Sequence, residues 1–523
     1  MSVLFVALAP VRFVPFPTAV FVVFVPAALR ALPATSLRAL RASRSSCPSC
    51  HNRPRVTSVT DDQPRAALQR RLGPWDAAAI IVANVIGGGI LFSPPQIAAS
   101  VPSPWLFLGT WFAGGALACA GAMAYAELAT VRPRAGGEYV YLDAAFGRGA
   151  AFLTGWTSFV AGFSGAIATS ALVFAFYLGR FIPGAASDRA ILTIPIPGVP
   201  LTISPQSIVA LSLIAGMCWI HVRGVGPGRI VGNVLAALKV SALVAFIALG
   251  LAFGEGTMIH MQTIAAPVRP TSWLLALVPV MFTYSGWNAA AYVAEEIRDP
   301  SRNVPLALAL GTSVVILIYL GLNILYLYVL PIDKLAAING SVLDVIADRL
   351  LGSRAGNVMG VVSLVSLAAS ISAMTIAGPR VYWAMACDGV FLRSTARIHR
   401  RYGTPHVSII AQSIWSGVLV LSGRAQTLLN YTGFAVILFA GIAVTALFVL
   451  RAREPETKIP FRALGYPVAP TIFVIASFLI VVNAIYSDPR PSGAGVLIIL
   501  AGIPVYLWFS RAATQGRPYG AQS

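Results

Sequence analysis

Long stretches without a charged residue fill most of the chain, and the charges collect in the short segments between them. A helix that crosses a bilayer needs about 20 consecutive, mainly apolar residues. The stretches that carry no Asp, Glu, Lys or Arg are 77–126, 150–179, 190–222, 271–294, 303–332, 355–379, 402–423, 425–450, 463–487 and 491–510. The first holds two helices with a turn near Pro102 to Pro104, and 230–254 is interrupted only by Lys239. The pattern predicts an all-α membrane protein with about twelve transmembrane helices.

Two of these hydrophobic stretches are interrupted in the middle of the predicted span. The first break is Ile86-Gly87-Gly88-Gly89-Ile90 and the second is Phe282-Thr283-Tyr284-Ser285-Gly286-Trp287. Glycine weakens a helix, and irregular backbone at bilayer depth persists only where it is buried in protein or lines a wet cavity. The breaks fall at similar depths, after residues 75–87 of span one and 272–284 of span six. Such a pair predicts a five-plus-five inverted repeat, with the binding site of a secondary transporter at broken helices 1 and 6.

Composition agrees with a membrane protein and argues against nucleic acid as a partner. The 523 residues are 57% apolar and 11% charged, against about 25% charged in soluble domains; the mean hydropathy is +0.78. The net charge of +19 is spread over short loops and forms no basic face. With an inside N-terminus, inside loops hold fourteen Lys and Arg, from Arg132 to Arg462, against seven outside, from Arg189 to Arg490. The positive-inside rule then predicts a plasma (inner) membrane protein with both termini in the cytoplasm.

The first 71 residues differ from the rest, and we expect a disordered or spurious extension there. Residues 1–29 are apolar but contain four prolines and lack the basic start of a signal peptide, so a thirteenth span is the alternative. Residues 30–71 are rich in Arg, Ser and Pro. Cys47-Pro48-Ser49-Cys50-His51 has the spacing of a haem attachment site, but no folded domain surrounds it and no second zinc ligand pair follows. We expect no cofactor and no metal.

From Trp75 onward the chain resembles the amino acid–polyamine–organocation superfamily, and within it the L-type amino acid transporter branch and its bacterial relatives. The motifs that carry the resemblance, in order, are Ile86-Gly87-Gly88-Gly89-Ile90, Tyr125-Ala126-Glu127-Leu128, Pro133-Arg134-Ala135-Gly136-Gly137-Glu138-Tyr139-Val140-Tyr141, Gly155-Trp156-Thr157-Ser158-Phe159, Arg223-Gly224-Val225, Tyr284-Ser285-Gly286-Trp287-Asn288, Glu295-Glu296-Ile297-Arg298-Asp299-Pro300, Gly378-Pro379-Arg380-Val381-Tyr382 and Leu450-Arg451-Ala452-Arg453-Glu454-Pro455. The resemblance implies a permease transmembrane domain over 72–512, followed by a cytoplasmic tail at 513–523.

The two breaks provide opposite poles for a zwitterionic amino acid. Unwinding at Gly87–Gly89 exposes N–H groups that suit a carboxylate, whereas carbonyl groups near Phe282 to Ser285 suit an ammonium group. The predicted substrate-binding residues are Ile86, Gly87, Gly88, Gly89, Ile90, Phe282, Tyr284, Ser285, Gly286 and Asn288. The resemblance adds that Phe282 is an outer-gate aromatic residue. The alternative for the glycines is close helix packing.

Other interpretations stay open for the residues around the second break. Tyr284 and Trp287 belong either to the site or to membrane-side or interior packing. The resemblance places Asn288 where arginine-exchanging relatives carry a glutamate, which argues against a cationic side chain in the substrate. The alternative for Asn288 is a hydrogen bond within the bundle.

Lys239 is the one charge inside a predicted span, and ionisable residues at this depth are usually functional. The resemblance places it in span five against spans one and eight, where sodium-coupled relatives hold a sodium ion. We predict that Lys239 serves in coupling, as a proton carrier or a fixed cation; the alternative is a lysine that snorkels to the interface. Hydroxyl groups of span eight could line a sodium site instead: Ser366, Ser370, Ser372 and Thr375.

These observations predict a secondary active transporter that moves neutral L-amino acids by alternating access, as a proton symporter or an exchanger. The four glutamates Glu127, Glu138, Glu295 and Glu296 are expected to pair with loop arginines at the cytoplasmic ends of spans. No acidic residue is therefore assigned to the cavity, which disfavours the alternative of a polyamine or organocation permease. A non-transporting amino acid sensor would favour an appended soluble domain, and we expect none after Ser510. The chain has no nucleophile–base arrangement and no phosphate-binding loop, so we expect no enzyme.

The expected partners are a small amino acid substrate and the lipid bilayer. Eukaryotic L-type relatives pair with a heavy subunit through a cysteine between spans three and four. The corresponding loop here, about 181–204, contains no cysteine, and we expect no disulfide-linked heavy subunit.

Overall fold

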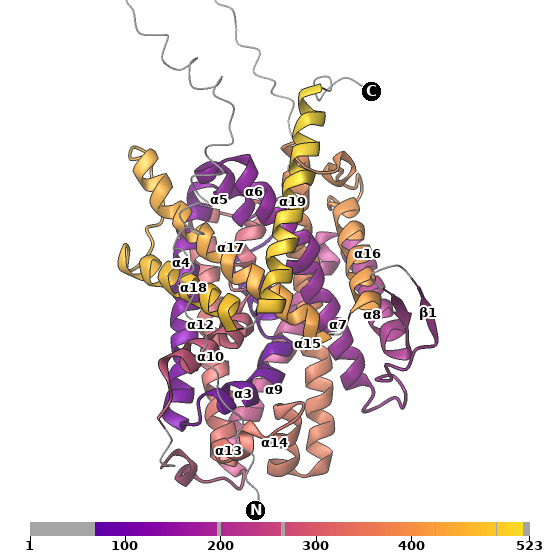
Figure 1. The fold of residues 1–523 in the computed structure, drawn as a ribbon, viewed down its shortest axis with the longest axis vertical. Helices are drawn as coiled ribbons and strands as arrows, with labels where there is room; N and C mark the ends of the chain where they lie inside the picture. The colour runs from indigo at the N-terminus through magenta and orange to yellow at the C-terminus, as the bar shows by residue number, and fades with distance from the viewer. Residues whose placement is uncertain (1–67, 196–199, 263–266, 424, 488, 516–523) are drawn as a thin grey trace, which may run out of the picture. The chain divides into compact units, whose positions relative to one another are not determined.

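The computed structural model describes residues 68–195, 200–262, 267–423, 425–487 and 489–515. Residues 1–67 of the extension predicted at 1–71, which include the alternative thirteenth span and the Cys-x-x-Cys-His segment, lie outside the described residues, as do residues 516–523 of the predicted tail. Most of the described chain is helical, and the long helices lie side by side in one bundle (Figure 1).

The helices follow the charge-free stretches closely. They are α2 (Pro74–Val85), α3 (Gly88–Ser100), α4 (Pro104–Val131), α5 (Glu138–Phe146), α6 (Arg148–Thr157), α7 (Phe163–Leu178), α8 (Pro205–Val222), α9 (Val225–Phe253), α10 (Pro270–Tyr284), α11 (Ala289–Tyr292), α12 (Pro300–Val329), α13 (Ile332–Ala336), α14 (Val342–Leu351), α15 (Ser353–Cys387), α16 (His406–Ser422), α17 (Ala425–Arg453), α18 (Val468–Ser487) and α19 (Pro489–Gln515). A π-helical turn, η1 (Ser158–Gly162), joins α6 to α7. The short 3-10 helices are η2 (Met258–Gln262), η3 (Ala294–Glu296) and η4 (Arg393–Ala396). Strands β1 (Leu192–Ile194) and β2 (Leu201–Ile203) form one antiparallel hairpin, with Leu192 opposite Ile203.

The number of spans agrees with the sequence prediction. Among the described residues, nine helices are long and apolar enough to cross a membrane, and the bent pair α2 and α3 makes a tenth. The apolar helices α10 and α16 are shorter, and with them the total is twelve. The predicted turn is also found, since α3 ends at Ser100 and α4 begins at Pro104. The prediction of an all-α membrane protein with about twelve spans is confirmed.

The packing of the helices relates spans one to four to spans six to nine. Among the most extensive contacts, α4 packs against α12, α7 against α15, α8 against α16 and α3 against α10. Each of these contacts joins a span to the one five positions later in the chain. An inverted repeat whose axis runs through the bundle would produce this pairing; the repeat itself stays a prediction.

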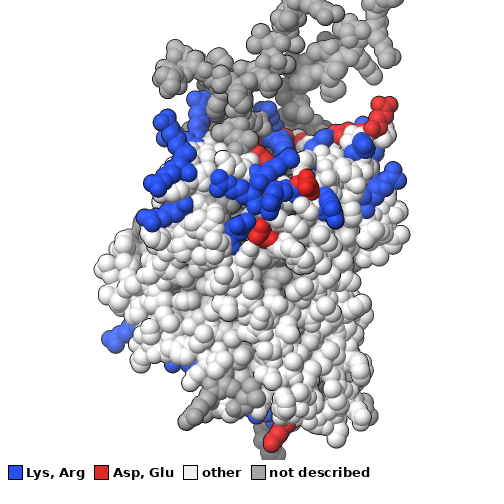
Figure 2. Space-filling view, turned by 180° about the vertical axis from the view of Figure 1, so that it is seen from behind, with Lys and Arg blue, Asp and Glu red and all other residues white. Residues whose placement is uncertain are grey.

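The basic residues are concentrated at one end of the bundle, which we call the basic end. Figure 2 shows Lys and Arg gathered at the end where α5 and α6 lie in Figure 1. The loops there carry Arg132 and Arg134, and the last turn of α17 carries Arg451 and Arg453. The middle of the bundle presents an almost uncharged surface in this view (Figure 2), as a lipid-facing surface should.

Ion pairs fasten the spans together at the basic end. Glu127, near the end of α4, is buried. Its carboxylate accepts hydrogen bonds from Arg451 Nε at 2.7 Å, from Arg451 Nη2 at 2.6 Å and from the Ala463 N–H at 2.6 Å. Nearby, Arg132 Nη2 lies 2.6 Å from the more exposed carboxylate of Glu454. The predicted pairing of Glu127 with an arginine is therefore confirmed, and its partner comes from span ten.

A second carboxylate is paired in the interior. The carboxylate of Glu296 in η3 accepts hydrogen bonds from Arg380 Nε at 2.7 Å and Nη2 at 3.1 Å. Both side chains are at most 3% exposed. Arg380 also donates to the Ile376 carbonyl at 2.6 Å. The prediction for Glu296 holds, although Arg380 lies within span eight rather than in a loop. Glu295 differs, because its Oε2 accepts the Ala135 N–H at 3.0 Å.

We predict that Arg380→Met destabilises the protein by about 3–5 kcal/mol, because it leaves the Glu296 carboxylate buried without a cation. The double variant Glu296→Gln/Arg380→Met should recover part of this loss. As a control, Arg132→Met breaks a pair whose side chains are 32% and 34% exposed, and it should cost at most about 1 kcal/mol. Thermal unfolding in detergent measures all three, and equal losses for Arg380→Met and Arg132→Met would contradict the prediction.

Candidate functional site

The first helix breaks where the sequence predicts. Helix α2 ends at Val85, and α3 begins at Gly88 at an angle of 47° to it. The carbonyl groups of Ala83 and Ile86 have no partner within the helix at this end. Lys239 Nζ of α9 donates to Ala83 at 3.1 Å and also to Ile86, and Ser370 Oγ of α15 lies 2.8 Å and 3.1 Å from the same two oxygens. The break is thus satisfied by side chains of two neighbouring spans.

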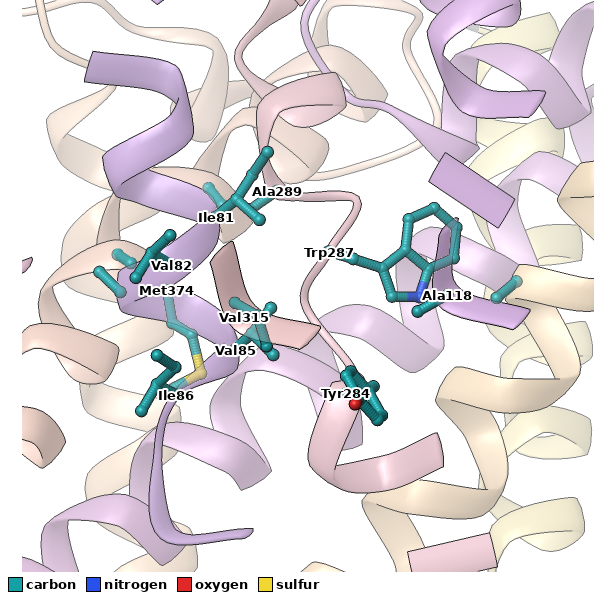
Figure 3. Packing of buried hydrophobic residues seen from close by; sticks show 14 of the residues in the cluster. Ile81, Val82, Val85, Ile86, Ala118, Tyr284, Trp287, Ala289, Val315 and Met374 are labelled. Carbon is teal, nitrogen blue, oxygen red and sulfur yellow. The ribbon is translucent and has the colours of Figure 1, made fainter. Parts of the chain in front are cut away.

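The second break follows α10. The chain leaves the helix after Tyr284 and becomes helical again only at Ala289 (Figure 3). Gly286 has a φ of +100°, a conformation that side chains with a Cβ rarely adopt. A Cβ at this position would also lie only 2.6 Å from Nδ2 of Asn84, which donates to the Gly286 carbonyl at 3.3 Å. Gly286 is therefore required by both its own conformation and the close approach of α2.

Two hydroxyl groups connect the breaks to each other. The hydroxyl of Tyr319, from α12, lies 2.9 Å from the Val85 carbonyl and 3.0 Å from the Thr283 carbonyl. Ser93 Oγ of α3 donates to the Gly89 carbonyl at 2.7 Å and lies 2.9 Å from Thr283 Oγ1. The two interrupted helices therefore form one structural unit.

A cavity of about 660 Å³ lies between the breaks. Seven of the ten predicted substrate-binding residues line it: Gly87, Gly88, Gly89, Phe282, Ser285, Gly286 and Asn288. The side chains of Ile86, Ile90 and Tyr284 do not line it, since all three are buried in the packing of the bundle. The cavity continues along α3 to Gln96 and Ser100, away from the basic end.

The three consecutive glycines have different roles. A Cβ on Gly87 would lie 2.9 Å from Ser370 Oγ, and one on Gly89 would lie 2.9 Å from Thr283 Oγ1 and 3.0 Å from its Cα. A Cβ on Gly88 would meet nothing nearer than 3.8 Å. Close helix packing, the alternative interpretation, therefore explains Gly87 and Gly89. Gly88 is the one that leaves room on the cavity side.

The aromatic residues of the second break belong to the interior packing. Trp287 is 4% exposed, and its ring makes edge contacts with Tyr125 and Phe473 at centroid distances of 4.8 Å and 5.8 Å. Figure 3 shows it directed toward Ala118 of α4, away from α2. Tyr284 donates to the Trp111 carbonyl at 3.2 Å. The packing interpretation is thus correct for the positions of both side chains.

Lys239 does not snorkel, because its side chain is fully buried and its amino group points at the end of α2. It lies against spans one and eight, as expected. Three of the four hydroxyl groups considered for a sodium site have other contacts. Ser370 shares the carbonyls with Lys239, Ser372 Oγ lies 2.9 Å from His221 Nε2, and Thr375 donates to the Ile371 carbonyl at 2.7 Å.

Glu138 is the main residue that the sequence reasoning assigned to the wrong surroundings. It was expected to pair with a loop arginine, but no ion pair of Glu138 is found in the described part of the chain. Its Oε1 accepts Tyr125 Oη at 2.7 Å and Asn288 Nδ2 at 2.8 Å, and the residue lines the cavity. The two preceding glycines, Gly136 and Gly137, have φ values of +117° and +51° and turn the chain inward. The Gly136–Gly137 pair was the sequence signal that could have indicated this inward turn.

The π-helical turn η1 was also missed. It carries Ser158 and Gly162 into the cavity lining, together with Thr157 before it and Phe163 after it. A π-helical turn adds one residue to a helix and is frequent at functional sites. Hydropathy cannot reveal it, because the span is equally apolar with or without the extra residue.

A membrane bundle with two interrupted helices around one cavity has the architecture of a secondary transporter. The chain belongs to the amino acid permease family, which matches residues 72–510, and thus to the amino acid–polyamine–organocation superfamily. It is an integral membrane permease and not an enzyme. The predicted resemblance is confirmed.

The alignments with similar proteins span most of the chain. The large neutral amino acids transporter small subunit 2 of Rattus norvegicus is 29% identical over 452 residues, which are 84% of this chain and 80% of that protein. The Asc-type amino acid transporter 1 of Homo sapiens is 28% identical over 465 residues, 86% of this chain and 84% of the relative. The b(0,+)-type amino acid transporter 1 of Mus musculus is 28% identical over 447 residues, 85% and 88% of the two chains.

We predict that Gly88→Leu abolishes substrate binding and leaves the fold intact, because the new side chain enters the cavity without a backbone clash. Gly109→Leu is the matched control, since Gly109 is exposed on α4 and a Cβ there meets nothing within 4 Å. Binding affinity in detergent and the melting temperature measure both effects. Unchanged affinity in Gly88→Leu would remove this glycine from the site.

Proposed function

We propose that this permease is a secondary active transporter of neutral L-amino acids, working by alternating access as a proton symporter or an exchanger. The observation that carries the proposal is the meeting of both helix breaks at one cavity. The substrate lies between them, and the five-plus-five repeat allows the cavity to open alternately toward each side of the membrane.

The chemistry of the two breaks matches the two charges of an amino acid. The first N–H groups of α3, at Gly88 to Ile90, have no partner within the helix and form its positive end, which suits the carboxylate. The ammonium group is held by the last carbonyl groups of α10: that of Tyr284, and the second lone pairs of Phe282 and Thr283, which already accept the Ser285 N–H at 2.9 Å and the Tyr319 hydroxyl at 3.0 Å. Phe282 lines the cavity and covers the bound substrate.

A neutral side chain is favoured over a cationic one by two observations. The relatives include a transporter named for large neutral amino acids. Glu138 does line the cavity, which removes the earlier argument that no carboxylate is present there. However, its Oε1 already accepts from Tyr125 and Asn288, so only Oε2 is left and the two-oxygen binding of a guanidinium group is blocked.

The charge distribution supports one orientation in the membrane. We propose that the basic end faces the cytoplasm, because positive charges are retained on that side during insertion. Both termini then lie in the cytoplasm, and we further propose that the membrane is the plasma (inner) membrane.

Uptake into proteoliposomes tests the function. We expect labelled leucine or alanine to accumulate when a pH gradient or an internal amino acid is present, with no need for sodium. Competition by a neutral amino acid but not by lysine or putrescine supports the neutral class. Accumulation of putrescine alone would favour an organocation permease, and tight binding without any uptake would favour a sensor.

The coupling role of Lys239 gives a further prediction. Lys239→Ala removes a buried cation beside the first break and should reduce transport roughly tenfold or more, equivalent to about 1.4 kcal/mol, with substrate binding less affected. Ser370→Ala is the matched control, because it removes a hydrogen bond to the same carbonyls without removing charge. Strict sodium dependence of the wild type together with an active Lys239→Ala would overturn this role.

We also predict that the protein works without a disulfide-linked heavy subunit, because the loop of residues 181–204 contains no cysteine. Electrophoresis of membranes with and without reductant checks this. A higher-mass band that disappears on reduction would contradict it, and a double-alanine variant at Cys47 and Cys50 would then locate the bond.

A further inference from the structure

We propose that Glu138 binds and releases a proton during the transport cycle, and that its charge controls the closure of the cavity toward the basic end. The site is a single carboxyl group in the lining of the cavity, and its ligand is a proton from water. This proposal rests on the proposed function only in assuming that the cavity opens alternately to both sides.

The position of Glu138 makes it a junction between three elements. It is the first residue of α5, and its carboxyl group is held by Tyr125 from α4 at 2.7 Å and by Asn288, just before α11, at 2.8 Å. The hydroxyl oxygen of Tyr292, in α11, accepts from Asn288 Nδ2 at 3.1 Å, and Tyr292 also interacts with the Glu138 carboxyl group. Elements from both halves of the chain therefore meet on one carboxyl group.

The surroundings of Glu138 contain no compensating cation. The titratable groups that face it are all tyrosines: Tyr125 from α4, Tyr141 from α5 and Tyr292 from α11. No Lys or Arg in the described residues forms an ion pair with it, and it is only 5% exposed. An ionised carboxylate in such a place is costly. Glu127 and Glu296 are buried to a similar degree, and each has an arginine.

The geometry favours a proton over a metal cation. Oε1 is occupied by two donors, which leaves Oε2 as the oxygen that can gain a hydrogen. A hard metal cation needs several oxygen ligands, and no group of three His, Cys, Asp or Glu suited to a metal is found among the described residues. A proton needs only one oxygen and leaves both bonds to Oε1 in place.

The two charge states bind the neighbouring elements with different strength. The ionised carboxylate accepts charge-assisted hydrogen bonds, which are about twice as strong as neutral ones. It therefore holds α4, α5 and the segment after the second break together, and the basic end stays closed. When a hydronium ion in the cavity transfers its proton to Oε2, an O–H bond forms, a water molecule is left and the junction weakens. The reverse transfer to water on the other side restores the charge.

The first test is the pH profile of exchange in proteoliposomes. Wild-type exchange should change by roughly fivefold or more between about pH 5 and pH 8, whereas Glu138→Gln should change less than about twofold because it cannot ionise. Glu454→Gln is the matched control, since this carboxylate lies in a partly exposed ion pair at the basic end, and it should keep the wild-type profile. A wild-type profile in Glu138→Gln would overturn the proposal.

A second variant separates proton binding from a structural role. Tyr125→Phe removes one donor to the ionised form, so the midpoint of the profile should move to higher pH. A merely structural contact would lower the rate and leave the midpoint in place, and that result would count against the proposal. Two other results would equally overturn it. One is a sodium-dependent wild type whose sodium dependence is lost in Glu138→Gln, and the other is a Glu138→Gln variant that loses only the transport of cationic substrates.

An infrared titration keeps this inference separate from the proposed function. In reconstituted protein without substrate, a protonated-carboxyl band should appear as the pH falls in the wild type and in Glu454→Gln, and be missing in Glu138→Gln. The band tests proton binding even if no amino acid is transported. Transport without such a band would overturn the role of Glu138 and leave the transport proposal standing.

Discussion

The need to satisfy backbone polar groups inside a membrane controls the architecture of this permease. Breaking a helix at bilayer depth frees carbonyl and N–H groups that have no water to bind. The carbonyls of Ala83 and Ile86 are taken by Lys239 and Ser370, and those of Val85 and Thr283 by Tyr319. Each partner comes from a different span, so the surrounding bundle is arranged to support the breaks.

How much could be predicted depended on whether the signal was local in the sequence. Charge-free stretches and the glycines at 87–89 and 286 act through local physics, so the spans and both breaks were predictable. The surroundings of Glu138 were not, because its partners Tyr125 and Asn288 come from distant parts of the chain. The burial of Tyr284 and the turn η1 likewise depend on packing that hydropathy does not encode.

The two breaks are each accompanied by one buried ionisable residue. Lys239 lies at the negative C-terminal end of α2, where a cation is favoured by the helix dipole, and Glu138 occupies the positive N-terminal end of α5. Neither forms an ion pair in the described part of the chain. Each relies instead on polar but uncharged neighbours, which makes its charge sensitive to movements of the helices around it. In this respect the pair differs from Glu296 and Arg380, whose charges are locked together.

The pairing of Glu127 with Arg451 has a consequence for biosynthesis. The partners are 324 positions apart, and the Ala463 N–H that completes the site comes later still. A ribosome therefore delivers Glu127 to the membrane long before its arginine exists. Until span ten is inserted, this carboxylate must remain in the headgroup region or borrow another cation. Chains that stop before Arg451 keep the Glu127 carboxylate at the end of α4 without its arginine.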